Sequence, residues 1–298
     1  MKRNVIRRRL SELKSPADNG SKDGGVQSVD RALLIIETLA EDDEGYRLSD
    51  LSVRTGLSTS TVHRLLATLE KRRFVQFDRY ESKWHVGAQS FAVGATFARR
   101  RNFVAQAMPY LRKLRDQTRE TANLAVVDDE SIIVLTRMES REIMRSLTKV
   151  GGRVAMVASG VGKAVLATYS DDDVNAIIHR QGMPRLTEKS IVRPSELFKE
   201  LQAIRRQGYA VDDEEARIGL RCVAAVVYND CSEPLAAISV SGMTSRLTDD
   251  RLPAIGRTMR EIAAELTAAI GGAMPAAADG ASAKREFGQT DNSTFSSR

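Results

Sequence analysis

Hydroxyl and basic side chains between residues 58 and 71 have the types and spacing that bind the phosphates and base edges of nucleic acids. On a helix they share one face, opposite an apolar stripe with i, i+3, i+4, i+7 spacing. The polar face holds Thr59, Ser60, His63, Arg64, Thr68 and Lys71, and the stripe holds Val62, Leu65, Leu66 and Leu69. The face predicts nucleic-acid contact, although an ordinary helical hairpin could carry the same pattern.

A tight turn between two helices would position that face. Gly56 lies where a helix that starts near residue 48 needs a left-handed residue to end. Ser58 or Thr59 can cap the second helix with its hydroxyl, and we expect Ser49 to cap the first. This is the arrangement of a helix-turn-helix, whose second helix enters the major groove of DNA. The expected DNA contacts are Ser49, Ser58, Thr59, Ser60, Thr61, His63 and Arg64.

Two β-prone runs follow this segment directly. Residues 74–77 and 84–86 are rich in Phe, Trp and Val, and polar residues 78–83 separate them. The pattern predicts a two-stranded wing with Arg79 and Lys83 near its tip, where they contact phosphates or are simply solvated. Together with a preceding helix that Ser28 is expected to cap, residues 26–87 are expected to form a winged helix-turn-helix domain.

Positive charge is concentrated in the same part of the chain. Residues 1–101 contain 19 Lys or Arg and 13 Asp or Glu, whereas the rest contains 26 of each, so the net charge of +6 belongs to the first third. A basic surface confined to one module is what phosphate neutralisation and electrostatic steering require. Residues 1–25 have no apolar period and are expected to be a disordered arm, either inert or touching DNA.

The chain changes character after residues 88–101, which are expected to form one linker helix. Between residues 102 and 272, short β-prone runs alternate with helical stretches. Strands paired through hairpins and flanked by helices predict an α+β domain built on an antiparallel sheet. Residues 273–298 are rich in Ala, Gly and Ser and are expected to be a disordered tail.

A second group of residues has the chemistry to bind a small oxyanion. Residues 159–162, Ser-Gly-Val-Gly, lead into an expected helix whose first amides could donate to a carboxylate. Ser239 and Ser241 are two apart in an expected strand, so both hydroxyls project to one face. Each feature has a simpler alternative, because Ser159 can be only a helix cap and the strand serines can be bonded to backbone.

Other classes of chemistry have less support. The run from Gly160 to Lys163 lacks the first Gly and the final Ser or Thr of a phosphate-binding loop. Cys222 has no evident base that would make it a nucleophile. Three scattered histidines and two cysteines offer no metal-ligand spacing, and no apolar run approaches the ~18 residues of a membrane span. We therefore expect a cytoplasmic protein that is not an enzyme and uses no cofactor, no metal and no membrane.

Several ordered motifs resemble the IclR family of bacterial transcription regulators. They are Val26-Gln-Ser-Val-Asp-Arg-Ala-Leu, Ser60-Thr-Val-His-Arg-Leu-Leu, Gly208-Tyr-Ala-Val-Asp-Asp-Glu-Glu, Gly219-Leu-Arg-Cys-Val-Ala-Ala and Ala237-Ile-Ser-Val-Ser-Gly. The resemblance covers residues 26–272 and implies a winged-helix domain, a linker helix and a GAF-like α/β effector domain at residues 102–272. It also implies a homodimer that assembles into a homotetramer on palindromic sites in double-stranded promoter DNA.

The effector region resembles the subgroup around the acetate operon repressor, which senses glyoxylate and pyruvate. This resemblance implies that a small 2-oxo acid, glyoxylate first, controls promoter binding and contacts the backbone amides of Gly160 and Val161. The other polar contacts it implies are Asp212, Cys222, Ser239 and Ser241, and the apolar wall is Leu147, Val154 and Leu220. Val161 replaces a smaller residue and narrows the site in favour of a two-carbon ligand. A glyoxylate-assimilating pathway, such as the glyoxylate shunt or the β-hydroxyaspartate cycle, follows from the subgroup alone.

The wing departs from the family pattern at two places. Arg73 replaces the Gly that usually precedes the wing, and Glu81-Ser-Lys-Trp replaces the usual Thr-Gly-Arg-Tyr. These departures bear on the geometry of the wing. Two alternatives to a ligand-controlled regulator are left open by the sequence: a DNA-binding protein that needs no ligand, and an enzyme that acts on a small oxo acid.

Overall fold

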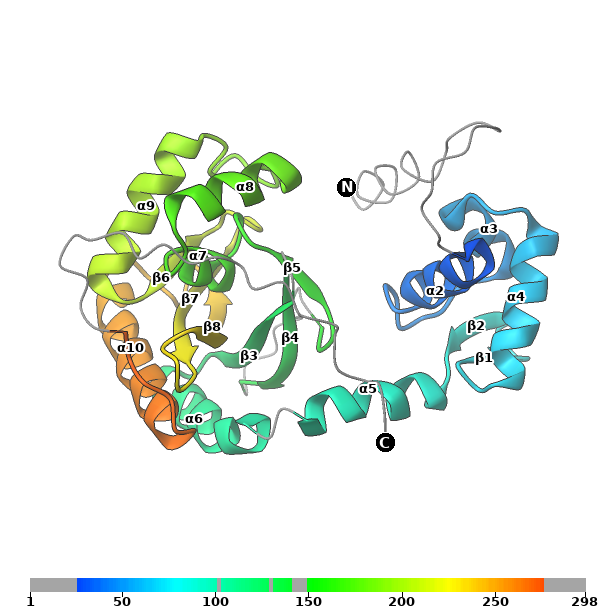
Figure 1. Ribbon diagram of the computed structural model, residues 1–298, viewed down its shortest axis with the longest axis horizontal. Helices are drawn as coiled ribbons and strands as arrows, with labels where there is room; N and C mark the ends of the chain where they lie inside the picture. The colour runs from blue at the N-terminus through cyan, green and yellow to red at the C-terminus, as the bar shows by residue number, and fades with distance from the viewer. Residues whose placement is uncertain (1–25, 101–102, 129–130, 141–148, 276–298) are drawn as a thin grey trace, which may run out of the picture. The chain divides into compact units, whose positions relative to one another are not determined.

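The computed structural model describes residues 26–100, 103–128, 131–140 and 149–275 (Figure 1). The chain divides between Arg100 and Arg101 into two compact units, and each is described by itself. The expected arm at residues 1–25 and residues 276–298 of the expected tail lie outside the described residues, as does Leu147. In the part of the chain that the structure describes, no helix is both long and apolar enough to cross a membrane.

The first unit combines helices with a two-stranded hairpin. Its elements are α2 (Gln27–Leu39), α3 (Leu48–Thr55), α4 (Thr59–Lys71), β1 (Val75–Asp78), β2 (Lys83–Val86) and α5 (Ala88–Arg100). The core lies between α2, α3, α4 and the hairpin, where Ile35, Leu51, Val62, Leu66 and Trp84 are all buried. The residues of α4 that face this core belong to the apolar stripe, so the helix-turn-helix forms as the periodicity predicts.

The turn between α3 and α4 uses the expected residues. Gly56 is left-handed, with a φ of 68°, and ends α3. The Ser58 hydroxyl caps α4, because it accepts the Thr61 amide at 3.3 Å. The cap leaves the first turn of α4 fixed and its polar face directed away from the core.

The expectation that Ser49 caps α3 is wrong. The helix already begins at Leu48, after an Arg47 with extended backbone. The Asp50 carboxylate accepts the Arg47 amide at 3.3 Å and stabilises this helix start. Ser49 therefore lies inside the first turn, where it is exposed and has no capping role. Ser28 likewise lies inside α2 and does not cap it.

The wing forms with left-handed backbone at both departures from the family pattern. Arg73, at the base of the wing, has a φ of 64°, and Ser82, in the turn between β1 and β2, has a φ of 56°. Glycine adopts such angles freely, whereas other residues do so at a cost. The Asp78 carboxylate accepts the amides of Tyr80 and Glu81 and holds the rest of the turn.

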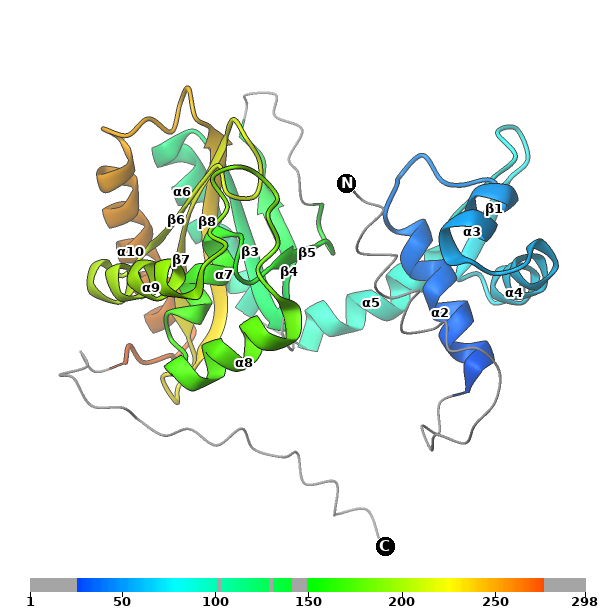
Figure 2. The ribbon, with the colours of Figure 1, turned by 90° about the horizontal axis from the view of Figure 1, so that it is seen from above.

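The second unit is an antiparallel sheet with helices on both faces (Figures 1 and 2). Its helices are α6 (Phe103–Thr118), α7 (Gly160–Leu166), α8 (Asp171–Gln181), α9 (Pro194–Gln207) and α10 (Leu252–Ala269). Its strands are β3 (Thr121–Asp128), β4 (Ser131–Met138), β5 (Arg153–Ala155), β6 (Ala210–Asp213), β7 (Leu220–Tyr228) and β8 (Pro234–Met243). The strand order is β5-β4-β3-β8-β7-β6, and each neighbouring pair is antiparallel.

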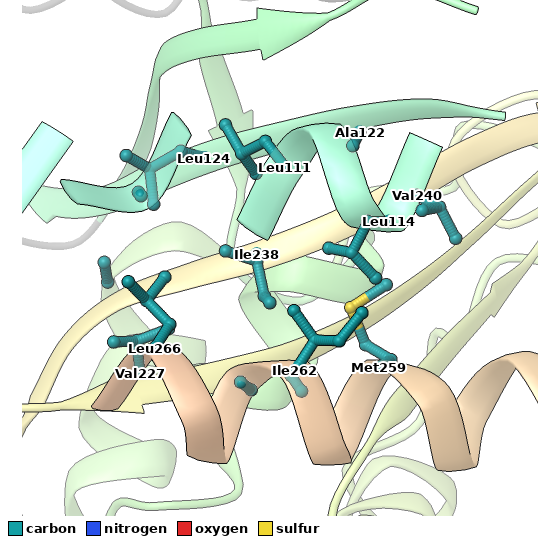
Figure 3. Close-up of a cluster of buried hydrophobic side chains, with 14 of the residues drawn as sticks. Leu111, Leu114, Ala122, Leu124, Val227, Ile238, Val240, Met259, Ile262 and Leu266 are labelled. Carbon is teal, nitrogen blue, oxygen red and sulfur yellow. The ribbon is translucent and has the colours of Figure 1, made fainter. Parts of the chain in front are cut away.

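Alternation along the strands separates the two faces of the sheet. Ile238 and Val240 of β8 point to one face, where they pack with α6 and α10 in an apolar core (Figure 3). Ala237, Ser239 and Ser241 point to the opposite face, which α7 covers. The first face is closed by hydrocarbon, whereas the second brings polar strand residues against the start of α7.

The predicted fold class is confirmed: an α+β chain in which a winged helix-turn-helix is followed in the sequence by a domain built on an antiparallel sheet. Strand β5 was not predicted, because three residues are too short for a pattern of alternation to show.

Candidate functional site

A cavity of about 90 Å³ lies on the α7 face of the sheet. The residues that line it are Asn123, Ala125, Val134, Val154, Ser159, Gly160, Val161, Asp212, Ala216, Arg217, Leu220, Arg221, Cys222, Ser239 and Ser241. Every effector residue that the family resemblance implies, and that lies among the described residues, lines this cavity. Leu147 lies outside the described residues.

Strand register explains why residues far apart in the sequence meet at this cavity. Asp212 of β6 pairs with Cys222 of β7, which pairs in turn with Ser241 of β8. Ser239 lies two residues along β8 from Ser241, at the next rung that faces the same side, and pairs with Asn123 of β3. The side chains of these two rungs point to the same side of the sheet, so they form one polar floor.

Asn123 is a site residue that the sequence reasoning missed. Its side chain amide donates to the hydroxyls of Ser239 and Ser241, both at 3.4 Å. Each hydroxyl acts as the acceptor in these bonds, and both serines also hydrogen-bond the Cys222 side chain. The signal for Asn123 was a polar residue directly before the apolar run at residues 124–127.

The start of α7 supplies the opposite wall of the cavity. Ser159 caps the helix, since its hydroxyl accepts the Gly162 amide at 3.0 Å and donates to the Ala155 carbonyl at 2.7 Å. The amides of Gly160 and Val161 have no acceptor within the described part of the chain. Ser159 is therefore a helix cap, and the amides of Gly160 and Val161 are still left without an acceptor at the cavity. The capping role and the ligand-binding role predicted for this segment are compatible.

Close packing at this wall favours glycine. A Cβ atom added to Gly160 would lie 3.1 Å from the Cys222 carbonyl oxygen and 3.2 Å from its sulfur. Such contacts are tighter than ordinary van der Waals packing, so a larger residue would make its neighbours shift by a few tenths of an ångström. The close approach holds the free amides of α7 near the serine hydroxyls of the sheet.

Burial changes the titration of two groups in the cavity. It raises the pKa of the Asp212 carboxyl, even though Oδ1 accepts the Glu215 amide at 2.8 Å and the nearby Lys163 acts in the opposite direction. Burial, together with the Asp212 charge, raises the pKa of the Cys222 thiol to about 11. The thiol is therefore protonated near neutral pH, which makes it a poor nucleophile.

A buried ion pair lies behind the cavity. The ammonium group of Lys163, which is 0% exposed, binds Oε1 of Glu215, and it lies 3.3 Å from Oε1 of Glu200. Burial raises the pKa of Glu215, while Lys163 acts against this shift. The pair joins α7 to the loop that follows β6.

The predicted DNA contacts lie on the surface of the first unit. Ser49, Ser58, Thr59, Ser60, His63, Arg64 and Arg79 are exposed, and Thr61 and Lys83 are half-buried. Lys83 forms an ion pair with Glu81 at 2.9 Å, so part of its charge is already neutralised. Thr59 donates to Ser52 at 3.4 Å, which links the start of α4 to α3. The exposed face of α4 thus carries the hydroxyl and basic side chains predicted to contact DNA.

Comparison with protein families decides what these two units are. Residues 28–79 match the IclR helix-turn-helix domain, and residues 95–268 match the bacterial transcriptional regulator IclR C-terminal domain. The chain belongs to the IclR family. It is a DNA-binding transcriptional regulator and not an enzyme.

Individual relatives of the IclR family agree with this assignment. The acetate operon repressor of Salmonella typhimurium is 41% identical over 251 residues, which cover 84% of this chain and 92% of that protein. The transcriptional repressor IclR of Escherichia coli is 40% identical over the same shares. The crystal structure of an IclR transcriptional regulator from Alicyclobacillus acidocaldarius has a TM-score of 0.71 and 25% identity, covering 83% of this chain and 100% of that one.

Proposed function

We propose that a small 2-oxo acid, glyoxylate first and pyruvate second, binds the cavity and controls promoter binding by this IclR-family chain. The observation that carries the proposal is the set of donors around the cavity. The amides of Gly160 and Val161, which have no acceptor in the described part of the chain, and the hydroxyls of Ser239 and Ser241 line the same cavity. Donors on both sides suit a ligand that has a carboxylate at one end and a carbonyl at the other.

The size of the cavity limits the ligand. A volume of about 90 Å³ suits a small ligand. Val154, Val161 and Leu220 border the same space, so the carbon atoms of the ligand have apolar contacts.

On the output side, we propose that α4 reads a palindromic site in double-stranded promoter DNA. A palindrome matches a homodimer, and two homodimers form the homotetramer that the family resemblance implies. The contacts proposed for the wing are Arg79 and Lys83. We further propose repression as the direction of control, because the Salmonella and Escherichia coli relatives are named as repressors.

Titration of the full chain with glyoxylate and pyruvate tests the proposal. A ligand at 100 times its dissociation constant adds about 2.7 kcal/mol to the free energy of unfolding, and thermal unfolding detects this. An operator is first selected from random DNA duplexes, and its affinity is then measured by fluorescence anisotropy with and without each acid. If neither acid changes thermal stability or operator affinity, the chain is a regulator without this effector.

A further inference from the structure

Arg217 places a cation without a counterion at the cavity. It belongs to the loop of residues 214–219 between β6 and β7, lines the cavity and is exposed, so it lies at the mouth. Among the residues that the structure describes, its guanidinium takes part in no ion pair and no hydrogen bond. A cation in this position can meet a ligand that enters.

The charges around Arg217 are already matched. Arg221, the other cation that lines the cavity, binds Asp213 and Asp249, both at 2.6 Å, and donates to the Leu247 carbonyl at 2.7 Å. Lys189 binds Asp213 at 3.2 Å. The Lys189 ammonium group also binds Glu214 at 2.5 Å, and Lys163 binds Glu215. Of these four cations, only Arg217 has no carboxylate partner in the part of the chain that the structure describes.

One carboxylate in the cavity opposes an anionic ligand. Asp212 is 6% exposed and lines the cavity, and only backbone amides bond to its Oδ1. An anion that enters therefore meets a negative charge with little water to screen it. The binding of a carboxylate needs a positive charge that offsets this repulsion.

The loop that carries Arg217 is held firmly on both sides. Its first half is fixed through its carbonyl groups, because Thr187 donates to the Glu214 carbonyl and Ser190 to the Glu215 carbonyl, both at 2.8 Å. Its second half is fixed by Glu214 Oε2, which accepts the Gly219 amide at 2.7 Å. A cation on a fixed loop loses less entropy when it binds a ligand than one on a mobile loop.

We infer that Arg217 determines the specificity of the cavity for anionic ligands, by supplying the positive charge that faces the ligand carboxylate at the mouth. The inference rests on the proposed function, since it takes a 2-oxo acid as the ligand. A charged hydrogen bond of this kind changes affinity by about tenfold or more. The residue is exposed and has no partner within the described chain, so its replacement leaves the fold intact.

A charge series in the full chain tests the inference. Arg217→Lys keeps the charge, Arg217→Ala removes it and Arg217→Glu reverses it. We expect the affinity for glyoxylate and pyruvate, measured by isothermal titration calorimetry, to fall little in the first variant, about tenfold in the second and further in the third. The loss should shrink in 0.5 M salt, about where ionic screening becomes strong.

The matched control is Arg257→Ala, on the exposed side of α10 and away from the cavity. This variant should bind both acids as the wild type does. The inference would be overturned if all three Arg217 variants bound the two acids as tightly as the wild type does. It would also be overturned if Arg217→Lys lost as much affinity for them as Arg217→Ala. A wild-type chain that binds neither acid would instead overturn the proposed effector, together with the role of Arg217 that depends on it.

Discussion

Replacement of Lys163 by Met is expected to lower the free energy of unfolding of the second unit by about 3–5 kcal/mol, the usual loss when one partner of a buried ion pair is removed. Glu215 is 5% exposed, and its Oε2 already lacks a hydrogen-bond partner in the described structure. Without the Lys163 ammonium group, Glu215 is left as a buried charge that water does not reach. Glu200 adds less to this loss, because its side chain is 33% exposed and can be hydrated.

The double variant Lys163→Met with Glu215→Met separates the charge effect from packing. Removing both partners leaves no buried charge, and such replacements are often neutral in stability. We therefore expect the double variant to recover most of the loss. The coupling between the two changes should reach about 0.5–3 kcal/mol in a double-mutant cycle.

Chemical denaturation can assign the loss to the correct unit. Trp84 is the chain's one tryptophan and lies in the first unit, so its fluorescence follows that unit. Circular dichroism follows the helices of both. Lys163→Met should shift the circular dichroism transition and leave the Trp84 transition in place. A loss below about 1 kcal/mol, or a double variant no more stable than the single one, would refute the reasoning.

The loss should also depend on pH in a definite direction. Burial raises the pKa of Glu215 above its ordinary value in the folded state. A carboxyl with a raised pKa favours folding when it is protonated, and this contribution disappears as the pH rises through the folded pKa. Removing Lys163 takes away a group that lowers this pKa, so the deficit of Lys163→Met should be smaller at pH 5 than at pH 8.

Three further predictions concern the two surfaces and the thiol. Arg64→Ala should weaken operator binding by about 1–3 kcal/mol in an anisotropy titration, and full affinity would remove Arg64 from the recognition surface. Ser239→Ala combined with Ser241→Ala should abolish the response to glyoxylate and keep operator affinity, whereas loss of both would indicate a folding defect. At pH 8 only about one Cys222 thiol in a thousand is ionised, so iodoacetamide followed by mass spectrometry should label the exposed Cys231 first, and faster labelling of Cys222 would contradict its raised pKa.

Local patterns were sufficient to predict the helix-turn-helix. The stripe of Val62 and Leu66 fixes which face of α4 is buried, and Gly56 marks the end of α3. Both signals lie within a few residues of the structure that they specify. Ser49 shows the limit of this reasoning, because a cap depends on the residue at which the helix starts. Sequence patterns leave that start uncertain by a turn.

The cavity depends on pairings that a single sequence does not contain. Asn123 reaches Ser239 and Ser241 because β3 lies beside β8, which are more than a hundred residues apart. Lys163 meets Glu215, 52 residues away in the sequence, because α7 packs against β6 and β7. The family resemblance supplied the contacts that lie in matching motifs. It did not supply Arg217, because this residue stands out only once the structure shows that its guanidinium has no partner among the described residues.

Arg73 has a further consequence for how the regulator responds to its surroundings. It holds a left-handed backbone angle that costs a residue other than glycine about 1 kcal/mol, and it keeps an exposed cation at the base of the wing. Cations on a DNA-binding surface displace the ions condensed on DNA, and each phosphate contact adds about 0.9 to the steepness with which affinity falls with salt. The chain thus accepts some strain at the base of the wing and keeps a positive charge there. We expect this charge to steepen the fall of promoter affinity with salt, an input separate from any effector.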